Sequence, residues 1–122
     1  MNLLRLFLGK LIVFMDQLTS PTPIQRDATQ QEQFDQETKS LTLYQFETCP
    51  FCVKVRREIR RLNLKIELRD VRKNKADHQE LLAGGGQIQV PCLRITKPDG
   101  SVQWMYESDD INAYLSERFG GA

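Results

Sequence analysis

Two cysteines at the end of a predicted strand constrain the fold of this chain more than any other feature. Residues 41–46 alternate apolar and polar side chains and end in residue types that favour strands, which predicts a strand of about six residues. The segment Thr-Cys-Pro-Phe-Cys, residues 48–52, follows directly. Because proline is favoured at the first position of a helix, Pro50 predicts that a helix begins there with Cys49 as its N-cap. The sequence therefore places two thiols three positions apart at a strand–helix junction.

This placement predicts that the two thiols differ in acidity. At an N-cap, the Cys49 sulfur lies where first-turn amides, here those of Phe51 and Cys52, point at an acceptor and where the helix dipole favours negative charge. In such motifs the cysteine pKa falls from about 8.5 to about 3.5–7.5, and the thiolate is the nucleophile. Cys52 is expected inside the first turn and more buried. We predict Cys49 as the attacking thiol and Cys52 as the resolving thiol.

Two other roles for paired cysteines fit the sequence less well. A structural zinc ion needs four ligands, and only Cys92 and His78 remain as candidates, so we expect no metal site. The odd total of three cysteines and the lack of a cleavable signal sequence disfavour a static disulfide in a secreted domain. The free thiols indicate a reducing compartment, and we expect the protein in the cytoplasm.

The Thr-Cys-Pro-Phe-Cys segment after a strand resembles the active site of glutaredoxins, in which the usual middle pair is Pro-Tyr. The resemblance covers residues 41–119, roughly two-thirds of the chain. It implies an α/β, thioredoxin-like (glutaredoxin) fold: a four-stranded mixed sheet flanked by helices, here with an extra N-terminal amphipathic helix.

The later patterns agree with that fold. A helix of about a dozen residues after Cys49 and an alternating strand over residues 64–69 form a parallel βαβ unit with a right-handed crossover. A short helix is expected over residues 76–83, closed by the glycines at 84–86. A turn at 98–101 predicts a final antiparallel hairpin, and the last helix opens at 106–111.

Val90 and Pro91 open the third predicted strand, because proline cannot donate to a sheet ladder. The segment resembles glutaredoxins, thioredoxins and the N-terminal domains of glutathione transferases, which carry a cis proline facing the active-site cysteine. The resemblance implies that the Val90 backbone pairs with bound glutathione as a short added strand. An ordinary trans proline is the alternative. Cys92 is expected to pack as a small apolar side chain, with a redox role left open.

The start of the last helix resembles two family patterns at once. Ser108-Asp109 takes the place of the glutaredoxin residues that hold the γ-glutamyl group, and Glu107-Ser108 matches the Glu-Ser pair of glutathione transferases. A helix N-terminus with Ser108 suits the α-carboxylate of glutathione, and Glu107 or Asp109 suits its α-ammonium group. The implied glutathione-binding residues are Val90, Pro91, Glu107, Ser108 and Asp109.

The sequence also departs from the glutaredoxin pattern. Phe46 stands where a lysine is common, with Glu47 beside it, and both changes disfavour a thiolate. We therefore expect Cys49 to be less acidic than in a typical member, with Lys54 or Arg56 compensating at most in part. Tyr106-Glu107 replaces a Gly-Gly pair and leans toward the transferase pattern, whose helical domain is not expected here.

Residues 1–18 form a separate pattern. When they are placed at 100° per residue, they predict an amphipathic helix over residues 3–18 with a wide apolar face. Its polar and small residues gather in one arc: Asn2, Arg5, Gly9, Lys10, Asp16 and Gln17. The run is shorter than the about twenty residues that a membrane span needs. Three roles stay open: packing on the domain or on a second copy, anchoring in the membrane interface, which would place the protein peripherally at the inner membrane face, or a weakly hydrophobic span.

The rest of the organisation is simple. Residues 19–40 are turn-rich and then glutamine-rich, and predict a linker with either a short helix, capped by Asp27, or a tether. Residues 41–122 form the predicted glutaredoxin-like domain, and a chain of 122 residues suffices for one core. Residues 54–75 carry ten basic and three acidic side chains, but the net charge of +1 gives no indication of a nucleic-acid partner, and we expect none.

These patterns lead to one main function and two alternatives. We expect a glutathione-dependent thiol–disulfide oxidoreductase of the dithiol glutaredoxin type, with glutathione as co-substrate and protein or low-molecular-weight disulfides as substrates. The first alternative is a glutathione-binding module related to a truncated glutathione transferase, in which Cys49 does not cycle. The second is iron–sulfur carriage by Cys49 and glutathione across a dimer, which Pro50 makes less favourable by the family's usual pattern.

Overall fold

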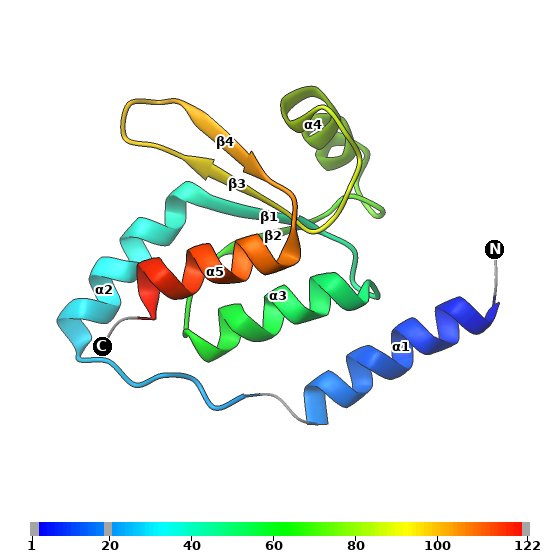
Figure 1. The fold of residues 1–122 in the computed structure, drawn as a ribbon, viewed down its shortest axis with the longest axis horizontal. Helices are drawn as coiled ribbons and strands as arrows, with labels where there is room; N and C mark the ends of the chain where they lie inside the picture. The colour runs from blue at the N-terminus through cyan, green and yellow to red at the C-terminus, as the bar shows by residue number, and fades with distance from the viewer. Residues whose placement is uncertain (1–2, 19–20, 121–122) are drawn as a thin grey trace.

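The first strand, β1 (Leu41–Gln45), lies inside the sheet and carries the candidate site at its end. The computed structural model describes residues 3–18 and 21–120, and its four strands stand in the order β2-β1-β3-β4 (Figure 1). β2 (Glu67–Asp70) is parallel to β1, whereas β3 (Cys92–Thr96) and β4 (Val102–Met105) continue the sheet in antiparallel order. This is the four-stranded mixed sheet that the sequence predicts.

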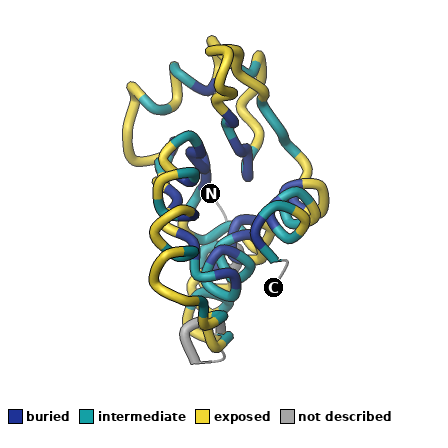
Figure 2. The backbone as a smooth tube through the Cα atoms, turned by 90° about the vertical axis from the view of Figure 1, so that its left-hand side faces the viewer, coloured by how far each residue is buried: buried dark blue, intermediate teal, exposed yellow. Residues whose placement is uncertain are grey.

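Helices cover both faces of the sheet. α3 (Pro50–Arg61) and α5 (Ser108–Phe119) pack side by side on one face, and α4 (Lys75–Gly85) lies on the other (Figure 1). Alternation along β1 explains the two layers, because Leu41 and Leu43 join the cluster under α3 and α5 while Tyr44 joins the cluster under α4. Figure 2 shows the buried positions gathered between the helices and the sheet.

β2 is shorter than expected, since pairing begins at Glu67 rather than at residue 64. The amide of Leu64 is used instead to close α3: it donates to the carbonyl of Ile59 at 3.0 Å, with Asn63 in the left-handed region at φ 55°. This bond satisfies a helix-end carbonyl but withholds the Leu64 amide from the sheet. Leu64 and Ile66 still serve the core, where both side chains are buried.

The three glycines after residue 83 do more than end a helix. Only Gly86, at φ 88°, caps α4, and Gly84 and Gly85 lie inside it. A Cβ on Gly84 would lie 2.1 Å from the Trp104 ring, and one on Gly85 would lie 1.8 Å from the Tyr106 hydroxyl. The pair therefore lets α4 approach the hairpin side of the sheet closely.

Residues 28–37 form a helix rather than a tether. α2 (Ala28–Glu37) begins after Asp27, whose carboxylate accepts from the Gln30 amide at 2.7 Å, and a short 3-10 helix, η1 (Thr38–Ser40), leads into β1. Phe34 is buried and meets the ring of Phe119 edge-on, with ring centroids 5.0 Å apart. α2 thus contributes to the core beneath α5.

α1 (Leu3–Leu18) packs against α3 near the start of that helix (Figure 1). Gly9 is buried there, and a Cβ at this position would lie 2.8 Å from the Cβ of Thr48. Within the described ranges, none of the helices is long and apolar enough to cross a membrane.

Candidate active site

Cys49 lies at the junction between β1 and α3. It has extended backbone angles (φ −78°, ψ 124°) as the N-cap of α3, and Pro50 occupies the first helical turn. The Cys49 carbonyl accepts the first helical bond, from the Val53 amide at 2.9 Å. The structure thus has the strand–cap–helix arrangement that the sequence predicts.

The two neighbouring thiols differ in acidity. The Cys52 thiol donates toward the Cys49 sulfur, and the Phe51 and Cys52 amides and the Arg56 charge act in the same direction, so the pKa of Cys49 falls to about 6 against the effect of burial. No side-chain hydrogen bond caps α3 in the usual geometry, so these amides stabilise the charge without forming a standard cap. At neutral pH Cys49 is mostly thiolate.

Cys52 is the complementary partner. Its side chain is fully buried, and its sulfur accepts from the Phe46 amide at 3.5 Å. Donation to the Cys49 thiolate, followed by burial, raises the pKa of Cys52 well above its usual range. Both cysteines are free thiols, so the half-buried Cys49 acts as the thiolate and the buried Cys52 keeps the proton.

Arg56 holds the loop that leads to Cys49. Its guanidinium donates to the carbonyl of Phe46 at 3.2 Å, to the carbonyl of Glu47 at 2.8 Å and to the side-chain amide oxygen of Gln45. The sequence offered Arg56 only as partial compensation for a missing lysine. Arg56 lies four residues after Cys52, so the two share one helix face. That spacing could have indicated that Arg56 reaches the cysteine loop.

The charge of Glu47 beside the cysteine loop is balanced. Its carboxylate pairs with Lys73 at 2.7 Å, and this hydrogen bond holds the pKa of Glu47 below its usual value. The Glu47 amide donates to the carboxylate of Asp70 at 3.2 Å, which ties the loop to the end of β2. The sequence reasoning missed Lys73, which is far from Glu47 along the chain.

The Val90–Pro91 peptide bond is cis, as the family resemblance implies. Tyr44 pairs with Cys92, so Pro91 lies level with Gln45, at the end of the sheet where the chain leaves toward Cys49. Cys92 itself is fully buried, and burial raises its pKa to about 12. Its thiol is therefore neutral and packed among apolar side chains.

The N-terminus of α5 lies beside the first turns of α3. Glu107 is its N-cap, Ser108 is buried, and the exposed Asp109 forms an ion pair with Lys54 of α3. This contact links the 107–109 segment to the helix that carries Cys52. The roles of Val90, Pro91, Glu107, Ser108 and Asp109 in binding glutathione stay predictions.

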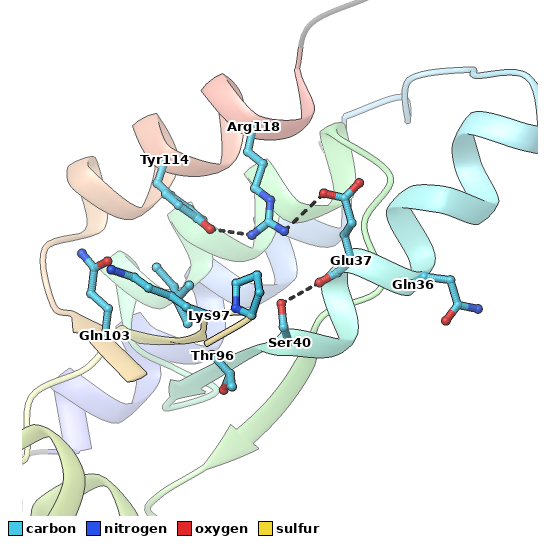
Figure 3. A pocket seen from close by; sticks show the side chains of 10 residues that line it. Gln36, Glu37, Ser40, Thr96, Lys97, Gln103, Tyr114 and Arg118 are labelled. Atoms are coloured by element: carbon cyan, nitrogen blue, oxygen red, sulfur yellow. Dashed lines mark hydrogen bonds and ion pairs between the residues drawn. The ribbon is translucent and has the colours of Figure 1, made fainter. Parts of the chain in front are cut away.

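Two other polar features lie away from Cys49. A cavity of about 570 Å³ opens near residues 95–98, at the opposite end of β3 from Pro91, where Arg118 donates to Tyr114 and pairs with Glu37 (Figure 3). On the α4 side, the Glu80 carboxylate accepts from Tyr44, Arg69 and Arg94. These bonds explain how charged groups are tolerated there, and hold the pKa of Glu80 below its usual value.

In the described part of the chain, the His, Cys, Asp and Glu side chains form no cluster suited to a metal ion.

Comparison with known proteins identifies the family. Residues 43–122 match the model of the glutathione S-transferase N-terminal domain. The chain belongs to this family. The thioredoxin-like fold and the likeness to glutathione transferases that the sequence predicts are therefore confirmed, and the family is named for glutathione.

Solved structures agree with the family. Maleylacetoacetate isomerase from Anaeromyxobacter dehalogenans 2CP-1 matches with 28% identity and a TM-score of 0.50, over 66% of this chain and 36% of the isomerase. A second structure of that enzyme, with bound dicarboxyethyl glutathione and citrate in the active site, gives 28% identity and a TM-score of 0.51, over 66% of this chain and 37% of the isomerase. This transferase-type domain thus spans little more than a third of those structures. A search of curated proteins finds no significant match.

Proposed function

We propose that this protein is an enzyme of glutathione-dependent thiol–disulfide exchange, with Cys49 as nucleophile and Cys52 as resolving thiol. The observation that carries the proposal is the difference in acidity within one hydrogen-bonded pair: the Cys49 pKa is about 6, whereas that of the buried Cys52 lies above its usual range. A thiolate at neutral pH next to a protonated thiol suits the two successive attacks of this chemistry.

The first step forms a mixed disulfide. The Cys49 thiolate attacks one sulfur of a substrate disulfide, a new sulfur–sulfur bond forms, and the other substrate sulfur leaves as a thiolate that takes a proton from solvent. Once Cys49 is in a disulfide, its negative charge is gone and the interactions that raised the Cys52 pKa are weakened. Cys52 then loses its proton to solvent more readily.

The second step releases the substrate. The Cys52 thiolate attacks the Cys49 sulfur, the bond to the substrate breaks, and the substrate leaves as a thiol while Cys49 and Cys52 form a disulfide. Two glutathione molecules restore the dithiol and leave as glutathione disulfide. Two electrons thus pass from glutathione to the substrate. With a glutathionylated substrate, glutathione can instead release Cys49 directly, so Cys52 is not needed.

The glutathione site we propose lies between three segments. By the family resemblance, the Val90 backbone beside Pro91 pairs with the glutathione backbone, and Ser108 with the first amides of α5 receives the α-carboxylate. Asp109 already pairs with Lys54, which makes Glu107 the better acid for the α-ammonium group. The glutathione derivative bound by the isomerase supports this ligand class.

The test is reduction of a glutathionylated peptide by the purified protein, coupled to NADPH through glutathione reductase. We expect activity that Cys49→Ser abolishes and Cys52→Ser retains at least in part. The Cys92→Ser variant is the matched control, because its buried neutral thiol takes no part in the exchange. Full activity in Cys49→Ser would overturn the proposal.

A second candidate is a transferase-type role in which Cys49 does not cycle. The family match and the isomerase structures favour it, as does the Glu107-Ser108 pair. In that case activity toward an electrophilic glutathione acceptor survives Cys49→Ser but is lost in Glu107→Gln and Ser108→Ala. Cys49→Ser therefore separates the two candidates, because it abolishes the exchange activity of the first and leaves the transferase-type activity of the second.

A further inference from the structure

The N-terminal helix presents an unexpected side to the domain. Gly9, which belongs to its polar and small arc, is buried against Thr48, and Leu6, Ile12 and Val13 beside it are partly buried. Close approach at Gly9 requires the absence of a side chain, because an added Cβ would lie 2.8 Å from the Thr48 Cβ and 2.9 Å from its carbonyl oxygen. The inward side of α1 is therefore centred on Gly9, with the apolar side chains of Leu6, Ile12 and Val13 around it.

A second set of apolar side chains on α1 points outward. At 100° per residue its exposed apolar side chains span an arc of about 120°. They are Phe7, Leu8, Leu11, Phe14 and Met15, with exposures between 43% and 64%. With this orientation, the apolar arc is exposed to water unless a partner or a membrane covers it.

Basic side chains are found at the edge of this arc and on the helix that α1 packs against. Lys10 is exposed at the edge of the arc. α3, on which α1 packs, carries five basic side chains and one acidic one, Glu58, and its Lys54 pairs with Asp109. The five are Lys54, Arg56, Arg57, Arg60 and Arg61. An apolar arc with a basic flank complements a surface of apolar chains below anionic headgroups.

The size of the arc also favours a lipid surface over a second copy of the chain. Five half-exposed side chains of about 200 Å² each offer roughly 500 Å², less than the about 800 Å² per partner of a standard stable interface. Burial in a bilayer interface needs no matching partner surface. The helix is too short to span, so it would lie in the plane of the interface.

We propose that α1 docks the protein on an anionic lipid bilayer through Phe7, Leu8, Leu11, Phe14 and Met15. Because Gly9 lies against Thr48, the residue before Cys49, docking through α1 would bring the cysteine loop near the lipid surface. If the proposed exchange activity holds, its substrates are disulfides at the membrane surface. The docking itself does not depend on that activity.

Flotation of the full chain with vesicles tests the proposal. We expect the protein to float with phosphatidylcholine vesicles that contain about a third phosphatidylglycerol, less with phosphatidylcholine alone, and less at high salt, because ions screen the basic flank. Phe7→Ser combined with Phe14→Ser should lower partitioning at least about tenfold. Leu82→Ser combined with Val102→Ser is the matched control, since these side chains are similarly exposed on other elements, and it should float like the wild type.

Three results would overturn the proposal. The protein could fail to float with the anionic vesicles, it could float equally well after Phe7→Ser with Phe14→Ser, or it could remain off the vesicles while sedimenting as a dimer that these substitutions dissociate. The last result would assign the arc to a second copy. None of them bears on reduction of a soluble glutathionylated peptide, so the two proposals fail separately.

A second measurement uses a substitution that keeps the arc of α1 apolar. Brominated lipids should quench a Phe14→Trp variant more strongly than the wild type, whose single tryptophan, Trp104, lies on β4 against Gly84 of α4. Equal quenching in the two proteins would contradict insertion of the arc.

Discussion

The guanidinium of Arg56 donates to the carbonyl oxygen of Glu47 at 2.8 Å, two residues before the Cys49 nucleophile. With its bonds to Phe46 and Gln45, this contact makes one side chain of α3 both a clamp on the cysteine loop and a source of positive charge for the thiolate. The chain thus has a cation near Cys49 without the lysine common at position 46 of the family pattern. The arginine reaches the loop from the following helix.

Arg56→Gln should raise the pKa of Cys49, because it removes a stabilising charge and loosens the loop. We expect a several-fold slower reaction with iodoacetamide near pH 6.5 and a smaller difference above pH 9, where both proteins are thiolates. Arg61→Gln, on the same helix but paired with Glu58, is the control and should leave the profile unchanged. If the pH profile of Arg56→Gln is unaltered, Arg56 does not stabilise the Cys49 thiolate.

The depressed Cys49 pKa predicts a pH-dependent stability. The thiolate is favoured in the folded state, so its contribution is fully present above the ordinary value near 9 and is lost as pH falls through about 6. Under reducing conditions, the free energy of unfolding of the wild type relative to Cys49→Ser should therefore rise between pH 6 and pH 9. Urea denaturation at several pH values measures this difference, and a flat difference would contradict the low pKa.

Ser108→Ala should weaken glutathione binding while leaving the nucleophile intact. The buried Ser108 lies at the start of α5, where a carboxylate would be received, and it has no part in lowering the Cys49 pKa. We expect the KM for glutathione to rise about tenfold, from loss of one hydrogen bond to a charged group, with an unchanged alkylation profile. Ser116→Ala, near the other end of α5, is the control. A change in kcat alone would point to a different role.

Phe34→Ala should destabilise the protein by about 3 kcal/mol, because it removes a buried aromatic ring that packs on Phe119. Phe51→Ala, at an exposed position, should change stability by less than about 0.5 kcal/mol. Thermal or urea denaturation compares the two. Equal effects would show that α2 does not contribute to the folding of the domain.

Gly84→Ala tests the close approach of α4 to the sheet. Alanine improves helix propensity by up to about 1 kcal/mol, but its Cβ would overlap the Trp104 ring, and overpacking costs about 1–3 kcal/mol. We expect net destabilisation with a change in Trp104 fluorescence. A stabilised variant with unchanged fluorescence would show that α4 moves away freely.

Local patterns in the sequence determined much of this protein. Alternation in residues 41–46, proline after Cys49 and the Pro98–Ser101 turn depend on neighbours along the chain, so the order of strands and helices around the thiols could be predicted. The N-cap position of Cys49 follows from the same local geometry. Its low pKa comes chiefly from near neighbours in the helix, first the Cys52 thiol and then the amides of Cys52 and Phe51.

Other features were decided by the tertiary structure. The length of β2 depends on the Leu64 amide, which closes α3. The need for glycine at positions 84 and 85 depends on the side chains of Trp104 and Tyr106, and the charge of Glu47 is balanced by Lys73. The orientation of α1 is the clearest case, since its periodicity shows two faces but not which of them meets the domain. That choice rests on Gly9 fitting against Thr48, a contact between residues thirty-nine positions apart, which no local pattern encodes.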